Sequence, residues 1–129
     1  MNSSKSKMDR RILVIDGHPV YIHKLAGFLG GLTFQNVALA VSGQDGINKA
    51  ELIKPDLVIL SGMLWDMPSE EVCRKIKAMN KNVKIIVQTG LFTEEEGLKK
   101  IKDGGADAIL ARKEKDLTPL QELIEEFMR

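Results

Sequence analysis

The sequence predicts an α/β fold in which five parallel β-strands alternate with five α-helices. Five short aliphatic runs recur along the chain, and segments with helical spacing separate them. The runs are apolar at successive positions, as in strands that are covered by helices on both faces. The connections between the runs and the helical segments are short, which favours a parallel sheet with right-handed crossovers. The expected architecture is therefore a doubly wound (βα)5 sheet.

Each predicted strand is a run of aliphatic, mostly β-branched residues. These runs are Ile12–Ile15, Val37–Val41, Leu57–Leu60, Val83–Val87 and Ala108–Leu110. In open parallel sheets, ligands bind beyond the carboxyl ends of the strands, near the switch in strand order. The residues that follow these runs are therefore the first candidates for a functional site.

Start and stop signals place the first two helices. Pro19 is typical of a first helical position, and Gly30-Gly31 marks the end of that helix. Ser42-x-x-Asp45 is a possible capping box for the second helix. The Lys54-Pro55 step ends the second helix, because the residue before a proline avoids the helical region.

Similar signals predict the other three helices. Ser69 is the expected N-cap of the third, and Thr93-x-x-Glu96 precedes a fourth helix that stops at Gly104-Gly105. Thr118 is the expected N-cap of the fifth, with Pro119 at its first position. The apolar stripes of the five helices are Ile22, Leu25 and Leu29; Ile47, Ala50 and Ile53; Val72, Cys73, Ile76 and Met79; Leu98 and Ile101; Leu120, Leu123, Ile124 and Phe127.

Length and composition indicate one soluble, cytoplasmic domain. The chain has 129 residues, is 43% hydrophobic and 29% charged, and carries a formal net charge of +1. The balanced charge gives no reason to expect direct nucleic-acid binding, and the longest apolar run is too short to span a membrane. We expect a flexible tail over residues 1–9 and a single domain over residues 10–129.

Four segments of the chain resemble, in order and at matching spacing, the receiver domain of bacterial response regulators. The first is similar to a strand that ends in an acidic pair, and the second to the strand that carries the phosphoacceptor aspartate. The third resembles the strand with a switch threonine, and the fourth the strand that ends in lysine and proline. These segments are Ile12–Pro19, Lys54–Ser61, Lys84–Gly90 and Gly105–Arg112. The resemblance implies a flavodoxin-like sheet with strand order 2-1-3-4-5.

The residues that would carry phosphorylation depart from the family pattern. The chain keeps the first acid as Asp16 and the threonine as Thr89. It has Gly17 at the second acidic position, Ser61 at the acceptor position and Arg112 at the lysine position. In the family, carboxylates at these positions hold Mg²⁺, which supports phosphoryl transfer. We therefore expect a vestigial pocket that binds neither Mg²⁺ nor another cofactor, with no catalytic residue.

The resemblance with these departures predicts a protein–protein interaction module that works without aspartyl phosphorylation. Its partner would be a histidine kinase, another regulator or an output protein. One alternative is a phosphorylatable receiver that uses Ser61 or Asp66, and another is the receiver portion of a longer regulator with an output domain. A third is a small-anion or nucleotide module in which Arg112, Thr89 and Ser61 hold the ligand. Asp16 is expected to pair with Arg112, and Thr89 either acts as a switch or bonds to nearby backbone.

The resemblance also places a possible interaction surface near the fourth helix and fifth strand. It comprises Lys99, Lys100, Lys102, Ile109, Lys113 and Lys115, with Trp65 in the loop after the third strand. The lysines form either a docking surface or an ordinary solvated face. Trp65 is either a lid over the pocket or an exposed contact residue.

Two further residue types carry little functional signal. His18 and His23 are five positions apart, so they do not share a helix face as metal ligands. Cys73 lies on an apolar stripe and is expected to be a buried structural residue.

Overall fold

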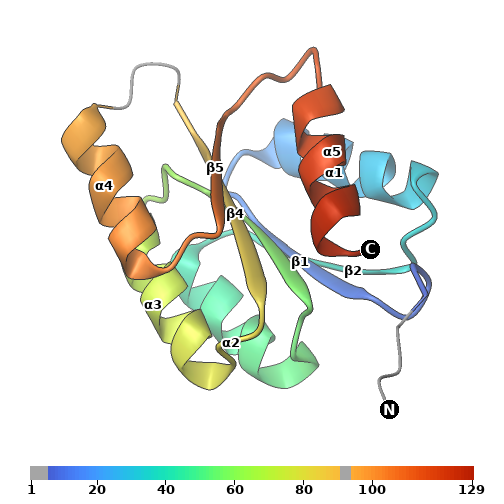
Figure 1. The fold of residues 1–129 in the computed structure, drawn as a ribbon, viewed down its shortest axis with the longest axis horizontal. Helices are drawn as coiled ribbons and strands as arrows, with labels where there is room; N and C mark the ends of the chain where they lie inside the picture. The colour runs from blue at the N-terminus through green and yellow to red at the C-terminus, as the bar shows by residue number, and fades with distance from the viewer. Residues whose placement is uncertain (1–5, 91–93) are drawn as a thin grey trace.

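The computed structural model describes residues 6–90 and 94–129 of the chain. Five parallel strands form one sheet in the order β2-β1-β3-β4-β5 (Figure 1), which confirms the predicted topology. The strands are β1 (Arg11–Ile15), β2 (Asn36–Ala40), β3 (Leu57–Ser61), β4 (Lys84–Thr89) and β5 (Ala108–Ala111). The helices are α1 (Pro19–Gly31), α2 (Gly43–Ile53), α3 (Ser69–Met79), α4 (Glu95–Gly104) and α5 (Thr118–Phe127).

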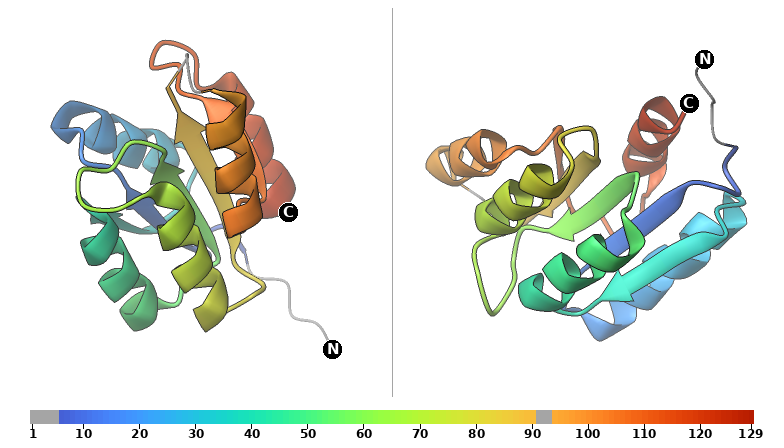
Figure 2. Two further views of the ribbon diagram at one scale, coloured as in Figure 1. Left: turned by 90° about the vertical axis from the view of Figure 1, so that its left-hand side faces the viewer. Right: turned by 90° about the horizontal axis from the view of Figure 1, so that it is seen from below.

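Helices cover both faces of the sheet (Figure 2), with α1 and α5 on one side and α2, α3 and α4 on the other. Alternate residues of β3 supply the two cores: Val58 and Leu60 pack on the side of α2 and α3, and Leu57 and Ile59 on the side of α1 and α5. Because both faces are buried, every residue of β3 is apolar except the last, Ser61. None of the helices in the described ranges is long and apolar enough to cross a membrane.

The first two helix starts are as predicted. Pro19 occupies the first turn of α1, and the Ser42 hydroxyl accepts a hydrogen bond from the Asp45 amide of α2 at 3.1 Å. The Asp45 carboxylate does not complete a capping box with Ser42. It instead accepts from the amide of Val41, one residue earlier, at 3.2 Å.

Two other predicted caps are wrong by one residue. Pro68 is the N-cap of α3 and already has an extended backbone, so the helix begins at Ser69 itself. Leu117 is the N-cap of α5, and the Asp116 carboxylate accepts from the Thr118 amide at 3.0 Å. That carboxylate takes the role expected of the Thr118 hydroxyl. Thr93, the expected cap of α4, lies outside the described residues.

Two apolar residues differ from their predicted environment, and Tyr21 is a core residue that the helix pattern did not include. Met79, at the end of α3, is exposed rather than part of the inner stripe. Val41 follows the end of β2 and is exposed, whereas the pattern placed it in the strand. Tyr21 is buried on α1, beside the predicted stripe, because its ring packs into the core on the α1 and α5 side.

The outer margin of β2 is covered by two charged residues of α2. β2 lies at the edge of the sheet, with β1 as its neighbour. The Leu39 carbonyl accepts from Lys49 Nζ at 2.6 Å, and the Val41 amide donates to Asp45. Lys49 and Asp45 are themselves an ion pair at 3.3 Å. Two backbone groups at the carboxyl end of β2, the Leu39 carbonyl and the Val41 amide, therefore have side-chain partners in α2.

Candidate functional site

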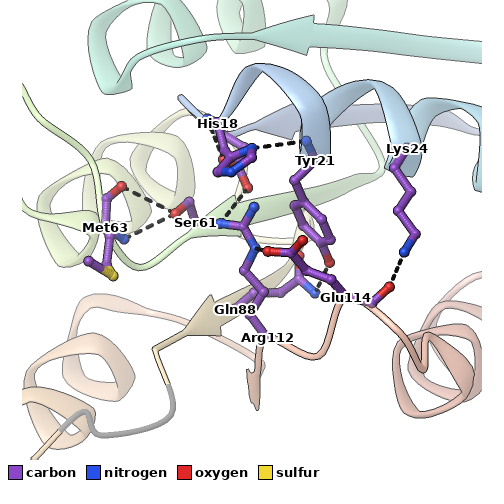
Figure 3. Close-up of polar contacts among 9 residues, drawn as sticks. His18, Tyr21, Lys24, Ser61, Met63, Gln88, Arg112 and Glu114 are labelled. Carbon is purple, nitrogen blue, oxygen red and sulfur yellow. Dashed lines mark hydrogen bonds and ion pairs between the residues drawn. The ribbon is translucent and has the colours of Figure 1, made fainter.

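The carboxyl ends of four strands bring the predicted pocket residues to one edge of the sheet. Asp16 directly follows β1, Ser61 and Thr89 end β3 and β4, and Arg112 directly follows β5. Figure 3 shows the side chains of Ser61 and Arg112 at this edge, beside Tyr21 and His18 of the α1 start. The register of the parallel strands is what aligns these four positions.

Asp16 is a buried acid with two partners. One carboxylate oxygen accepts from the His18 amide at 2.8 Å, and the other lies 3.7 Å from Nη1 of Arg112. The Asp16 side chain is 4% exposed, so the arginine supplies a countercharge in a place that water hardly reaches. The ion pair expected from the sequence is therefore present.

Arg112 makes further contacts that the sequence did not indicate. Its guanidinium carbon lies 3.7 Å from the centroid of the Tyr21 ring, and its Nε lies 3.6 Å from a Glu114 carboxylate oxygen. The planar guanidinium is thus stacked on an aromatic face, an arrangement that a lysine ammonium cannot reproduce. Within the described part of the chain, Nε and Nη2 have no hydrogen-bond partner.

Tyr21 extends this network to the fourth strand. Its hydroxyl accepts from Nε2 of Gln88 at 2.9 Å, and both side chains are buried. Burial raises the pKa of Tyr21 above its ordinary value, while Gln88 and the charge of Arg112 oppose part of that rise. Gln88 is a polar residue that directly follows the aliphatic run Ile85–Val87, and this was the sequence signal that could have revealed the contact.

The two hydroxyl residues of the pocket are bonded to nearby backbone. Ser61 Oγ accepts from the Met63 amide at 3.1 Å and lies 3.3 Å from the Met63 carbonyl, to which it donates. Thr89 Oγ1 donates to the Leu110 carbonyl at 3.4 Å. The backbone contact expected as one alternative for Thr89 is therefore present, and a switching role stays a prediction.

Gly17 lies between the end of β2 and the loop after β3. A Cβ atom at this position would be 3.3 Å from the Val41 carbonyl oxygen and 3.9 Å from Cδ1 of Trp65. A side chain here therefore has little space without movement of its neighbours. Trp65 is 81% exposed, so its side chain is not buried in the pocket, and a contact role stays a prediction.

Asp66 has a structural partner away from the pocket. Its carboxylate oxygens accept from the first two amides of α2, those of Gly43 at 2.8 Å and Gln44 at 2.9 Å. These backbone hydrogen bonds, led by the one from Gln44, lower the pKa of Asp66. The sequence pattern missed this contact because the partners are more than 20 positions away in the chain.

The predicted interaction surface is divided among separate places in the structure. Lys99, Lys102 and Ile109 line one shallow hollow along α4 and β5. Lys100 lines a different groove, together with Trp65. Lys113 and Lys115 are exposed in the connection between β5 and α5.

The remaining candidates have structural environments. Cys73 is buried, and burial raises its pKa to about 12. The His18 ring caps α1, because its Nδ1 accepts from the Tyr21 amide at 3.1 Å. Among the residues that the structure describes, no three His, Cys, Asp or Glu side chains gather as a metal-binding group.

Comparison with known proteins identifies the family. The family model of the response regulator receiver domain matches residues 12–125. The chain therefore belongs to the receiver domains of response regulators, as the four sequence segments suggested.

Individual relatives support this assignment. The chain is 30% identical to the transcriptional regulatory protein ZraR of Salmonella typhimurium over 124 residues, which cover 96% of this chain and 27% of that protein. It is 26% identical over 106 residues to the response regulator protein VraR of Staphylococcus saprophyticus, covering 81% of this chain and 50% of that protein. The chain thus spans half or less of the length of these curated relatives.

Solved structures give the same result. A two-component response regulator from Clostridium difficile superposes with a TM-score of 0.85 at 26% identity, over 94% of this chain and 97% of the other. The receiver domain of a DNA-binding response regulator from Colwellia psychrerythraea superposes with a TM-score of 0.81 at 26% identity. The superposition covers 92% of this chain and 97% of the other.

Proposed function

We propose that this receiver acts as a protein–protein interaction module in two-component or phosphorelay-type signalling, in the cytoplasm and without aspartyl phosphorylation. The observation that carries the proposal is the pairing of Asp16 with Arg112 beside a serine whose hydroxyl is bonded to backbone. The expected partner is a histidine kinase, another regulator or an output protein. Signalling would then depend on the shape and charge of the surface.

The donor set at the strand ends does not fit Mg²⁺. This ion prefers anionic oxygen ligands in an octahedral arrangement. Asp16 is the carboxylate available from β1, and its two oxygens face the His18 amide and Arg112. Gly17 supplies no side-chain ligand, and Ser61 supplies a neutral hydroxyl. A cation at this position would also meet the repulsion of the guanidinium.

The alternative acceptors are poorly placed for phosphorylation. A serine hydroxyl forms a phosphate ester rather than the acyl phosphate of an aspartate, and the Ser61 hydroxyl already bonds to Met63. Asp66 would have to release two amide hydrogen bonds from α2 before it could react. These contacts support the proposal that neither residue serves as an acceptor.

A titration with Mg²⁺ and beryllofluoride, an analogue of the acyl phosphate, tests the proposal. Trp65 is the single tryptophan of the chain, and its Cδ1 lies near the Gly17 position, so its fluorescence reports on the pocket. We expect no saturable change in emission and no mass increase after incubation with acetyl phosphate. A saturable, Mg²⁺-dependent change at millimolar metal or below would contradict the proposal.

Anion binding is a second candidate, because two guanidinium nitrogens of Arg112 have no hydrogen-bond partner in the described ranges. A ligand that binds only the folded state stabilises it by an amount that increases with the ratio of ligand concentration to Kd, so the melting temperature rises with ligand concentration. Inorganic phosphate or ATP would then raise the melting temperature of the wild type and leave that of Arg112→Ala unchanged. Equal shifts for both proteins would refute a site at Arg112.

A further inference from the structure

The loop between β3 and α3 exposes two large apolar side chains, Met63 and Trp65. Met63 is 75% exposed and Trp65 is 81% exposed. Tryptophan is highly buried on average, and exposed apolar side chains that share a patch often mark an interaction site. Both residues line a groove of about 470 Å³ that lies between this loop and α4. Leu64, Met67 and Pro68 from the loop and Ile101 from α4 add further apolar surface to the groove.

Hydrogen bonds hold this loop in one conformation. The Ser61 hydroxyl bonds to both backbone groups of Met63, and the Gly62 amide donates to the Gln88 carbonyl at 2.7 Å. At the other end of the loop, Asp66 accepts from the first two amides of α2. A fixed loop loses little conformational entropy when a partner binds. The two exposed side chains are therefore pre-positioned as anchors.

Met67 closes the packing between the loop and α2. A Cβ atom added at Gly43 would lie 2.6 Å from Cγ of Met67, so the loop approaches the start of α2 as closely as a glycine allows. This contact and the Asp66 hydrogen bonds attach the loop to α2 from two directions.

The rim of the groove is acidic. Its lining holds two carboxylates, those of Asp66 and Glu70, and one ammonium group, that of Lys100. The Asp66 carboxylate bonds to the first amides of α2. Lys100 reaches Glu96 at 3.9 Å, so a third carboxylate offsets the charge of the lysine. The net charge around the apolar floor is therefore negative, although the whole chain carries a formal charge of +1.

We propose that this groove binds a basic, amphipathic segment of a partner protein. Apolar side chains of the segment pack on Trp65 and Met63, and its lysines or arginines face the glutamates of the rim. This inference rests on the proposed function, since it names the kind of partner that such an interaction module binds. The groove is of opposite charge to Lys113 and Lys115 of the β5–α5 connection, so it selects a different partner surface.

A pair of designed peptides tests the charge preference. The first is a helical peptide of leucine and lysine with leucines at helical spacing, and the second has glutamate in place of every lysine. We expect the leucine–lysine peptide to shift the Trp65 emission to shorter wavelength in a saturable titration. The leucine–glutamate peptide should leave the emission unchanged. Equal binding of both peptides, or of neither, would overturn the proposal.

Matched variants locate the binding site, with fluorescently labelled peptide as the readout. Glu70→Lys with Glu96→Lys should weaken binding by about tenfold, because two favourable charge contacts become repulsive. The control Glu122→Lys with Glu126→Lys makes the same charge change at exposed positions of α5 and should leave the affinity within about twofold. An equal loss in the α5 control would show that the peptide responds only to net charge.

A second comparison tests the apolar anchors. Trp65→Ala should weaken binding by about tenfold or more, as expected for a central aromatic contact. Leu52→Ala removes an equally exposed side chain of α2, 80% exposed, and should have no effect. Equal affinities for the two variants would refute the role of Trp65. Sedimentation of the free protein provides a further check: a dimer that Trp65→Ala dissociates would assign the groove to a second copy and overturn the proposed occupant.

The same samples separate this inference from the proposed function. After incubation with acetyl phosphate and Mg²⁺, intact-mass measurement detects any phosphoryl group. A phosphorylated protein that binds the leucine–lysine peptide would contradict the proposed function and support the groove. An unphosphorylated protein that does not bind the peptide would contradict the groove alone.

Discussion

Replacement of Arg112 by alanine tests the contacts that distinguish this pocket. The change removes the guanidinium from the face of Tyr21 and takes the countercharge away from Asp16. The Asp16 carboxylate would keep the hydrogen bond from the His18 amide. It would have no countercharge in a place with little access to water. We therefore expect Arg112→Ala to lower the free energy of unfolding.

The structure sets the size of this effect. Stacking of a guanidinium on an aromatic ring contributes about 0.5–2 kcal/mol. Breaking a fully buried ion pair costs about 3–5 kcal/mol. The Arg112–Asp16 distance of 3.7 Å is too long for a hydrogen bond, and the arginine side chain is 19% exposed, so only part of that cost applies. We expect a total loss of about 2 kcal/mol, a shift of roughly 1 M in the urea midpoint.

Urea unfolding of a double-mutant cycle separates the two contributions. Asp16→Asn, Arg112→Ala and the double variant should show a coupling energy of about 1 kcal/mol between the two side chains. Arg112→Lys is the matched control, because it keeps the charge and loses the planar stack. Its free energy of unfolding should lie between those of the wild type and Arg112→Ala. If Arg112→Ala unfolds at the same urea concentration as the wild type with an equal slope, the reasoning about this pair is wrong.

Two other predictions concern the loop and the acceptor position. Asp66→Ala should lower stability by about 1–2 kcal/mol, as for other carboxylates that cap a helix. The folded pKa of Asp66 is lowered, so its charge stabilises the fold above the unfolded value near 4, and this contribution is lost as pH falls through the folded value. In urea melts, the difference in the free energy of unfolding between wild type and Asp66→Asn should thus become smaller from about pH 6 to about pH 3. A difference that does not change with pH would contradict this. Ser61→Asp alone should not take a phosphoryl group from acetyl phosphate, because Mg²⁺ would still lack an anionic ligand at Gly17. Gly17→Asp with Ser61→Asp should bind Mg²⁺, and adding Arg112→Lys should raise the phosphorylated fraction measured by intact mass; equal phosphorylation of the single and triple variants would refute this order.

The fold was predictable because its signals are local. Strand runs such as Leu57–Leu60 are apolar at every position, and this pattern follows directly from burial on two faces. Pro19 and Ser42 marked helix starts through their own backbone and side-chain chemistry. The cap at Ser69 was misplaced because the preceding Pro68 also satisfies the backbone requirement of an N-cap, so the local pattern fits two registers.

The candidate site was only partly predictable, because several of its contacts join distant parts of the chain. The strand ends and the Arg112–Asp16 pair followed from the alignment of parallel strands. The stack on Tyr21 depends on the direction in which Arg112 leaves β5, which no residue spacing specifies. Asp66 binds amides of α2, and backbone amides have no sequence signature. The exposure of Trp65 likewise depends on how that loop is held.

The contacts that Lys49 and Asp45 make along β2 also limit how the protein can aggregate. An uncovered edge strand offers its amides and carbonyls to any extended chain, including a partly unfolded copy of the same protein. Here the Leu39 carbonyl and the Val41 amide are already bonded to side chains of α2. At these two positions an added strand could pair only by displacing the charged groups. In an assembly that crowds many copies together, pairing through this end of β2 would therefore first have to break contacts within each copy.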